Sequence, residues 1–161
     1  MARTVAAFKV DHFQFLGPDG KLLDSQHVPA LARDFDRLRA LYTLLTLTRA
    51  SSLGHEAAHV AIGAAMADED CFAPMYREYG AQFYRGVKMT EVLLYWGGDE
   101  RGNAFSGPRH DFAWCVPIAT QCLHAAGAAM AYKLRNEARV AVSVVGDGGS
   151  SKGDFLEAIN A

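Results

Sequence analysis

The chain has 161 residues, of which 50% are apolar and 21% are charged, and its formal net charge is −2. This length and composition are typical of one soluble globular domain with a hydrophobic core and exclude a largely disordered chain. Acidic and basic residues are interspersed, so no basic stretch favours nucleic acid or an anionic membrane surface. We therefore expect the partners and ligands of this chain to be neither nucleic acids nor anionic membranes.

We expect neither a membrane-spanning segment nor a secretory leader. Gly, His or charged residues interrupt each apolar stretch before it reaches the length of a spanning helix, and the N-terminus lacks a basic region followed by an apolar run. Cys71, Cys115 and Cys122 are odd in number and have no metal-ligand spacing. They are expected to be buried, reduced thiols, with a catalytic thiol as the alternative, and the protein is predicted to be cytoplasmic.

The first part of the chain is predicted to form an N-terminal arm and one long helix. Residues 13–16 and 21–23 have the pattern of two short strands around the turn Pro18-Asp19-Gly20. From 28 to 47, apolar residues recur at every third or fourth position, which predicts an amphipathic helix.

The middle of the chain is predicted to contain two more helices and a loop. The Ala-rich segment 55–66 predicts one helix, and Thr90 is expected to be the N-cap of the next. Residues 97–110 combine Gly, Pro and mixed charge, so they are predicted to form a loop, and loops of this length often line functional sites.

The last third predicts the fold class. Residues 119–134 have a helical pattern, 140–145 form a nearly continuous apolar run rich in valine, and 151–160 are helical again. A strand that is apolar on both faces is typical of a parallel sheet covered by helices. The predicted fold is therefore α/β, a doubly wound parallel sheet that is incomplete in this chain and follows a helical N-terminal arm.

A glycine-rich acidic turn, Gly146-Asp147-Gly148-Gly149, directly follows the predicted strand. Ligands of open α/β sheets bind at the carboxyl ends of the strands. Glycine backbone can approach an anion closely, and a carboxylate is a suitable ligand for a divalent cation, so a phosphate bridged by Mg²⁺ would suit this turn. The alternative is a tight turn in which Asp147 only caps the next helix. A dinucleotide fingerprint is excluded because Ser151 occupies its third glycine position.

Four blocks of sequence carry a resemblance to a known family. In order along the chain they are Gly54-His55-Glu56-Ala57, Tyr76-Arg77-Glu78-Tyr79-Gly80, Val116-Pro117-Ile118-Ala119-Thr120-Gln121 with His124-Ala125-Ala126-Gly127, and the run from Gly146 to Asn160. These blocks resemble motifs in alpha subunits of the thiamine-diphosphate-dependent decarboxylating component of 2-oxoacid dehydrogenase complexes. The first is similar to that family's Gly-Gln-Glu-Ala, with His55 in place of Gln. The resemblance covers nearly the whole chain.

The resemblance implies a function and a set of site residues. Asp147 is implied as a Mg²⁺ ligand, and the residues implied to bind thiamine diphosphate are Tyr76, Arg77, Val116, Ile118, Asp147, Gly148 and Gly149. The implied activity is that of a pyruvate dehydrogenase alpha subunit, namely oxidative decarboxylation of a 2-oxoacid with acyl transfer to lipoamide. A branched-chain 2-oxoacid is the alternative substrate. The implied partners are a beta subunit, in a heterotetramer, and the lipoyl domain of an acyltransferase core.

The chain departs from the family pattern at two places. The family's second Mg²⁺ ligand is an Asn farther from the acidic turn than Asn160, and a longer segment normally separates the counterpart of Arg49 from that of Gly54. We therefore expect a truncated subunit, with an arm and helix over 1–50 and a partial cofactor-binding domain over 51–161. No catalytic residue is assigned in this chain, and the chain alone is expected to be inactive.

Two alternatives come from different functional classes. His55-Glu56-Ala57-Ala58-His59 matches the H-E-x-x-H pattern, in which two histidines on one helical face bind Zn²⁺ and the Glu acts as general base of a hydrolase. Glu78 is the candidate third ligand. The other alternative is a non-catalytic subunit that only binds a partner. His27, His110 and His124 are interpreted as ordinary surface or core histidines.

Overall fold

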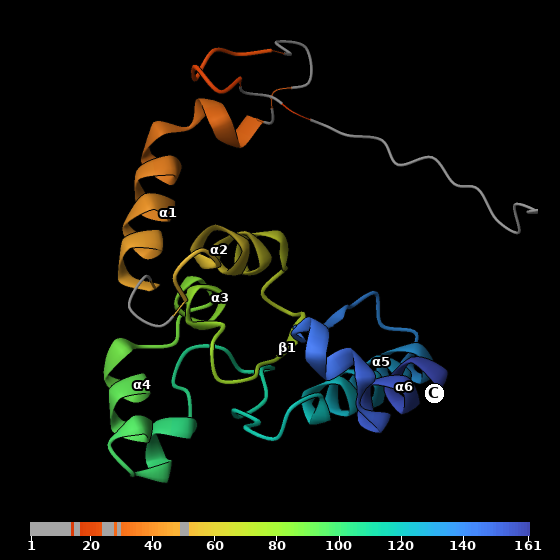
Figure 1. The fold of residues 1–161 in the computed structure, drawn as a ribbon. Helices are drawn as coiled ribbons and strands as arrows, with labels where there is room; N and C mark the ends of the chain where they lie inside the picture. Colours follow the sequence, from red (N-terminus) through yellow and green to blue (C-terminus); the bar gives the residue numbers. More distant parts are fainter. Residues whose placement is uncertain (1–13, 15–16, 24–27, 29, 49–51) are drawn as a thin grey trace, which may run out of the picture. The chain divides into compact units, whose positions relative to one another are not determined.

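A computed structural model describes residues 14, 17–23, 28, 30–48 and 52–161 of the chain. It has two compact units, residues 1–40 and 41–161, which are treated separately. The helices and strands, in chain order, are η1 (Ala30–Arg33), α1 (Phe35–Thr48), α2 (Glu56–Ala65), β1 (Cys71–Ala73), α3 (Tyr79–Tyr84), α4 (Met89–Trp96), η2 (Glu100–Asn103), α5 (Thr120–Arg135), β2 (Ala141–Ser143), η3 (Asp147–Ser151) and α6 (Gly153–Asn160) (Figure 1).

The predicted N-terminal turn is present, but the strands around it are not established. The Gly17 N–H donates to the Lys21 carbonyl at 2.8 Å, and the Asp19 carboxylate accepts from the Lys21 N–H at 3.1 Å. Residues 21–23 form an isolated bridge at Leu22 rather than a strand. Most of the segment 13–16 lies outside the described residues. A turn can form from local hydrogen bonds alone, whereas a strand needs a partner along its length.

The long helix begins later than its apolar pattern predicted. It runs from Phe35 to Thr48, and a short 3-10 helix occupies residues 30–33. The Asp34 carboxylate accepts a hydrogen bond from the Arg37 N–H at 3.0 Å, which is the geometry of an N-cap. The cap therefore defines the first helical turn, and the apolar periodicity upstream of it does not.

The sheet consists of two short parallel strands within the described residues. Cys71 is paired with Ala141, Phe72 with Val142 and Ala73 with Ser143. The sequence pattern predicted β2, although over 140–145 rather than 141–143, and did not predict β1. Mixed helices with a parallel pair agree with an α/β fold, whereas the doubly wound arrangement stays a prediction.

Burial of the two strands differs from the expectation for β2. The three residues of β1 are buried and those of β2 are only half-buried, while Val140 just before β2 is 56% exposed. The expectation of a strand buried on both faces is therefore wrong for β2, and the buried strand is β1, which was not predicted. Helix α5 packs against both strands. The segment that contains Asp111 also lies against β1, since the Asp111 carboxylate accepts the Phe72 N–H.

Four of the remaining α-helices, α2, α4, α5 and α6, follow the sequence pattern closely, whereas α3 was not predicted. Helices α2 and α5 differ from their predicted limits by one residue at each end, and the predicted helix 151–160 is divided into the end of η3 and α6. The N-cap of α4 is Lys88 and not Thr90. The Glu91 carboxylate accepts from the Lys88 N–H at 2.8 Å, which caps the helix at Lys88, two residues before Thr90. The predicted loop 97–110 contains η2.

One aromatic cluster forms the main hydrophobic core of the second unit. The indole of Trp114 contacts the rings of Tyr79, Tyr95 and Phe105, with centroid separations of 5.9, 4.5 and 5.5 Å. Its Nε1 donates to the buried Gln82 side chain at 2.7 Å. Trp114 therefore holds the segment that leads to Val116 and Ile118 against α3 and α4.

The cysteines agree with the expectation of buried thiols. Cys71, Cys115 and Cys122 are free and buried. Burial raises the pKa of the Cys71 and Cys115 thiols, which disfavours the reactive thiolate. Every helix in the described ranges is too short or too polar to span a lipid bilayer.

Two helical glycines allow a matched test of packing. A methyl group at Gly63 in α2 would lie 2.9 Å from both the Ala81 carbonyl oxygen and Tyr84 Cβ in α3, whereas one at Gly127 in α5 meets no atom within 4 Å. We expect Gly63→Ala to lower the free energy of unfolding by about 1–3 kcal/mol and Gly127→Ala to raise it by about 0.5–1 kcal/mol through helix propensity. Urea unfolding of both variants measures this. Equal effects of the two substitutions would contradict the close approach of α2 to α3.

Candidate functional site

The carboxyl ends of the two strands bring the predicted site segments to one edge of the sheet. The chain leaves β1 through Pro74 and Met75 to reach Tyr76 and Arg77, and it leaves β2 through Val144 and Val145 to reach Gly146. Because β1 and β2 are parallel, both exits lie at the same edge. This edge is where open α/β sheets bind ligands.

A cavity of about 250 Å³ opens at this edge. Its wall comes from α2 and the residue before it, from the segment after β1 and from the segment after β2, and consists of His55, Ala58, His59, Ile62, Met75, Arg77, Glu78, Val144, Val145 and Gly146. The cavity therefore brings Arg77, a predicted site residue, together with Gly146, the residue before Asp147.

The acidic turn forms the short 3-10 helix η3. The Asp147 carboxylate is exposed and accepts the N–H of Gly148 at 2.9 Å, and the Gly149 N–H donates to the Gly146 carbonyl at 2.9 Å. The residue before α6 is Lys152, so Asp147 is not the N-cap of that helix. The alternative in which Asp147 only caps the next helix is therefore wrong in this structure. No ion pair within the described ranges involves this carboxylate.

The three glycines of the turn differ in the space around their backbone. A methyl group at Gly146 or Gly148 would meet no atom within 4 Å, so their backbone borders open space. A methyl group at Gly149 would lie 2.5 Å from Val145 Cγ2 and 2.9 Å from Ile118 Cγ2. Gly149 is buried and permits close packing of the turn, and Gly148 has its backbone accessible to a ligand.

The Val116 to Ile118 segment lies next to the turn rather than in the cavity wall. Both side chains are half-exposed, and the Ile118 carbonyl accepts a hydrogen bond from Lys152 Nζ at 2.9 Å. Lys152 also pairs with Asp154 at 2.9 Å, and Asp154 accepts from the Thr120 hydroxyl at 2.8 Å. These contacts connect the segment to the start of α6, and they occupy the carbonyl of Ile118, a residue that the family resemblance implied for the cofactor.

Arg77 and Tyr76 are adjacent at the entrance to α3. The Arg77 guanidinium lies 4.9 Å from the centre of the Tyr76 ring, a cation–π distance. Arg77 is exposed, and no hydrogen bond or ion pair joins its guanidinium to another described residue. The side chain is therefore free to bind an anion.

Three buried polar side chains lie near this edge: the sequence analysis considered His59 and Glu78 only as zinc ligands and gave Gln121 no role. Gln121 Nε2 donates to the Val144 carbonyl at 2.7 Å and so fixes the end of β2, but its Oε1 has no partner among the described residues. His59 Nδ1 and the buried Glu78 carboxyl belong to residues of the cavity wall. A polar residue within an apolar helical face is the signal that could have indicated the burial of His59 and Gln121.

Burial shifts the pKa of two ionisable residues that line the cavity, His59 and Glu78. His59 is 5% exposed, and burial, followed by repulsion from His55, lowers its pKa. Glu78 is 2% exposed, and burial raises the pKa of its carboxyl, which accepts from the Met75 N–H at 2.9 Å. Both groups are therefore shifted toward their neutral forms.

The zinc hydrolase alternative is not supported by the geometry. His55 and His59 lie with ring centres 5.7 Å apart and share the cavity with Glu78. However, no three His, Cys, Asp or Glu side chains in the described ranges are close enough together to hold a metal ion. The Glu56 carboxylate, the expected general base, accepts the Gly54 N–H at 2.7 Å at the start of its own helix.

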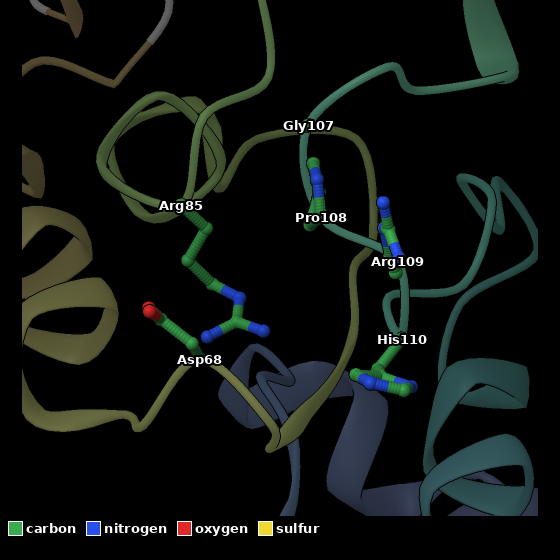
Figure 2. A pocket seen from close by; sticks show the side chains of 6 residues that line it. All are labelled: Asp68, Arg85, Gly107, Pro108, Arg109 and His110. Carbon is green, nitrogen blue, oxygen red and sulfur yellow. The ribbon is translucent and has the colours of Figure 1, made fainter.

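A second cavity, of about 350 Å³, lies between the end of α3 and the 107–110 part of the predicted loop. Figure 2 shows the Arg85 side chain extending toward the segment that carries Asp68, with Arg109 and His110 on the facing loop. The Arg85 guanidinium donates two hydrogen bonds to Asp111 and one each to the carbonyls of residues 67 and 70. His110 and His124 are exposed, as expected for ordinary histidines, and His27 lies outside the described residues.

Comparison with known proteins identifies the class to which this fold and site belong. Residues 31–161 match the family described as the dehydrogenase E1 component. The chain belongs to this family, which confirms the resemblance inferred from its motifs.

Individual relatives are alpha subunits of two kinds. The chain is 31% identical over 166 residues to the pyruvate dehydrogenase E1 component subunit alpha of Mycoplasma genitalium, covering 92% of this chain and 46% of the relative. It is 41% identical over 114 residues to that of Acholeplasma laidlawii, covering 71% and 33%. It is 33% identical over 171 residues to the 3-methyl-2-oxobutanoate dehydrogenase subunit alpha of Mycobacterium tuberculosis, covering 91% and 45%. The chain thus spans less than half the length of these curated relatives.

Proposed function

We propose that this chain supplies the diphosphate and Mg²⁺ half of a thiamine-diphosphate site in the alpha subunit of a 2-oxoacid dehydrogenase. The observation that carries the proposal is that Arg77 and Gly146, the residue before Asp147, line one cavity at the carboxyl edge of a parallel sheet. A cation and an exposed carboxylate at one edge are the groups that a metal-bridged diphosphate requires. The sheet is proposed to be part of a doubly wound sheet, with the cofactor-binding part over 51–161.

The residues at this edge fit the proposed group. The Asp147 carboxylate offers a hard oxygen ligand to Mg²⁺. The backbone at Gly148 borders open space, so phosphate oxygens can approach it, and Gly149 lets the turn pack closely beneath. Arg77 would bind phosphate oxygens with its planar fork and Tyr76 would support it from the ring face.

Val116 and Ile118 are proposed to support the organic part of the cofactor. Their side chains are half-exposed beside the turn, and the Ile118 side chain contacts Gly149. The Ile118 carbonyl would have to exchange its bond with Lys152 if it bound the aminopyrimidine. Since the lysine pairs with Asp154 as well, this exchange leaves the ammonium with an acidic partner.

The proposed overall reaction is oxidative decarboxylation of a 2-oxoacid with transfer of the acyl group to lipoamide. When bound, thiamine diphosphate supplies the chemistry of decarboxylation. This chain binds and orients the cofactor, a beta subunit completes the site in a heterotetramer, and the lipoyl domain of an acyltransferase accepts the acyl group. We favour pyruvate. A branched-chain 2-oxoacid is kept as the alternative, because relatives of both kinds match this chain. A cytoplasmic location remains a prediction.

Calorimetry of thiamine diphosphate binding tests the proposal. The chain and Asp147→Ala are titrated with and without Mg²⁺ and a matching beta subunit, with Asp68→Ala as a control at an exposed aspartate away from the turn. We expect Mg²⁺-dependent binding that Asp147→Ala weakens at least about a hundredfold, as for loss of a metal ligand, and that Asp68→Ala leaves intact. Absence of binding in every mixture would reject the proposal. Binding of the beta subunit without decarboxylation would favour the non-catalytic alternative.

A further inference from the structure

A third segment, besides the two strand ends, contributes to the cavity that contains Arg77 and Gly146. His55 is the residue before α2, and its side chain lines the same cavity. It makes no side-chain capping bond to its own helix. No hydrogen bond joins its imidazole to any residue that the structure describes, so the ring is available to a ligand.

The backbone holds His55 at a defined position relative to Arg77. The buried Ser52 accepts the His55 N–H with its carbonyl at 2.7 Å and donates its hydroxyl to the Arg77 carbonyl at 2.9 Å. One residue therefore connects the start of α2 to the segment after β1. His55 and Arg77 are presented to the cavity as a pair, although they are far apart in sequence.

The surroundings favour a negatively charged ligand at the entrance. Helix α2 directs its N-terminal N–H groups, the positive end of its dipole, toward the region of His55 and Ala58. The cavity wall is largely apolar and includes Ile62, Met75 and Val144. Apolar surroundings strengthen the interactions between charged groups at the cavity opening. Burial raises the pKa of Glu78, so this acid opposes an anion less than an exposed carboxylate would.

One further group in the cavity wall lacks a partner. His59 is buried, and its Nδ1 has no hydrogen-bond partner within the described ranges. It lies one helical turn from His55, with ring centres 5.7 Å apart. Since buried polar atoms are nearly always paired, this atom is available to a polar group of a ligand or to a water in the cavity.

We propose that His55 is a direct binding residue for the diphosphate, acting with Arg77 and the Gly146–Gly149 turn. The inference rests on the proposed function and adds a contact through a residue at which this chain differs from the Gly-Gln-Glu-Ala motif. The imidazole N–H donates to a terminal phosphate oxygen, and Arg77 binds the same group from the segment after β1. His59 is a buried residue of the same cavity wall.

Binding of three ligands by His55→Gln and His55→Ala tests this role. The full chain with its beta subunit and Mg²⁺ is titrated with thiamine diphosphate, with thiamine, and with inorganic diphosphate as a competitor. His110→Gln is the matched control, because His110 is an exposed histidine away from this cavity. We expect both His55 variants to weaken thiamine diphosphate and inorganic diphosphate binding about three- to tenfold, the loss expected for one ordinary hydrogen bond at a solvent-exposed position. Thiamine affinity should stay within error of the parent chain.

The outcomes separate this inference from the proposed function. Thiamine diphosphate binding that is lost in Asp147→Ala but unchanged in His55→Gln would overturn the role of His55 alone. Equal weakening of thiamine and of its diphosphate by His55→Gln would show a structural effect and also overturn it. Absence of thiamine diphosphate binding by the parent complex would overturn both. Thermal melting of His55→Gln within error of His110→Gln confirms that the variant is folded, and His55→Gln remains informative if His55→Ala does not fold.

Discussion

Replacing Asp111 by Ala is expected to lower the free energy of unfolding by about 3–5 kcal/mol, because it leaves a buried guanidinium without its counter-charge. The side chains of Arg85 and Asp111 are only 4% and 2% exposed. Arg85 Nε and Nη2 each donate to one carboxylate oxygen at 2.7 Å, the bidentate arrangement that is the strongest for this pair of groups.

The same carboxylate also holds the backbone of the sheet. Asp111 accepts the Phe72 N–H at 3.0 Å, so β1 loses a hydrogen-bond acceptor in the variant. Arg85 Nη2 donates in addition to the Asp70 carbonyl at 2.8 Å, just before β1. The ion pair thus connects the end of α3, the start of β1 and the segment that follows the loop 97–110.

Urea unfolding of three variants tests this prediction. Asp111→Ala should be the least stable, and Arg85→Met with Asp111→Leu should recover part of the loss, because the double variant contains no unpaired buried charge. Arg101→Ala is the control: it removes an ion pair to Asp99 whose arginine is exposed, and its unfolding midpoint should stay close to that of the parent chain. An Asp111→Ala midpoint within error of Arg101→Ala would contradict the burial of the pair.

Replacing Trp114 by Ala is expected to cost about 3–5 kcal/mol, as for a large side chain removed from a packed core. Trp114 is at the centre of the aromatic cluster, with the Tyr95 ring 4.5 Å away, centre to centre. Its backbone N–H donates to the Asn103 side chain at 2.7 Å, so it also joins η2 to the segment before Val116. Loss of the ring leaves a cavity and frees that segment.

A second substitution separates packing from hydrogen bonding at this position. Trp114→Phe keeps an aromatic ring but leaves the buried Gln82 Oε1 without its indole donor. We expect it to cost about 1–3 kcal/mol for the unsatisfied polar atom. Trp96→Ala is the control, because that indole is 54% exposed and contacts the same cluster from its edge, so its loss should be smaller than that of Trp114→Ala. Urea unfolding followed by circular dichroism measures all three, and equal losses for Trp96→Ala and Trp114→Ala would contradict a core centred on Trp114.

Local sequence patterns predicted most of the helices because helical contacts join residues three or four positions apart. Helix α5 and helix α2 agree with their predicted limits to within one residue at each end. The predicted N-terminal ends of α1 and α4 were wrong because a single capping side chain determines where each helix begins. Asp34 starts α1 later than the apolar pattern indicated, and Glu91 starts α4 before Thr90.

The sequence by itself also determined the family and the place of the acidic turn, since a run such as Gly146 to Asn160 is contiguous and can be compared directly. It did not predict β1, because a three-residue strand has no periodic pattern of its own and is defined by hydrogen bonds to β2, about seventy residues away. Only the tertiary structure decided that His55, Arg77 and Gly146 line one cavity and that Arg85 is buried against Asp111. Such contacts depend on how distant segments pack, and packing energy is shared among many residues rather than encoded at any one of them.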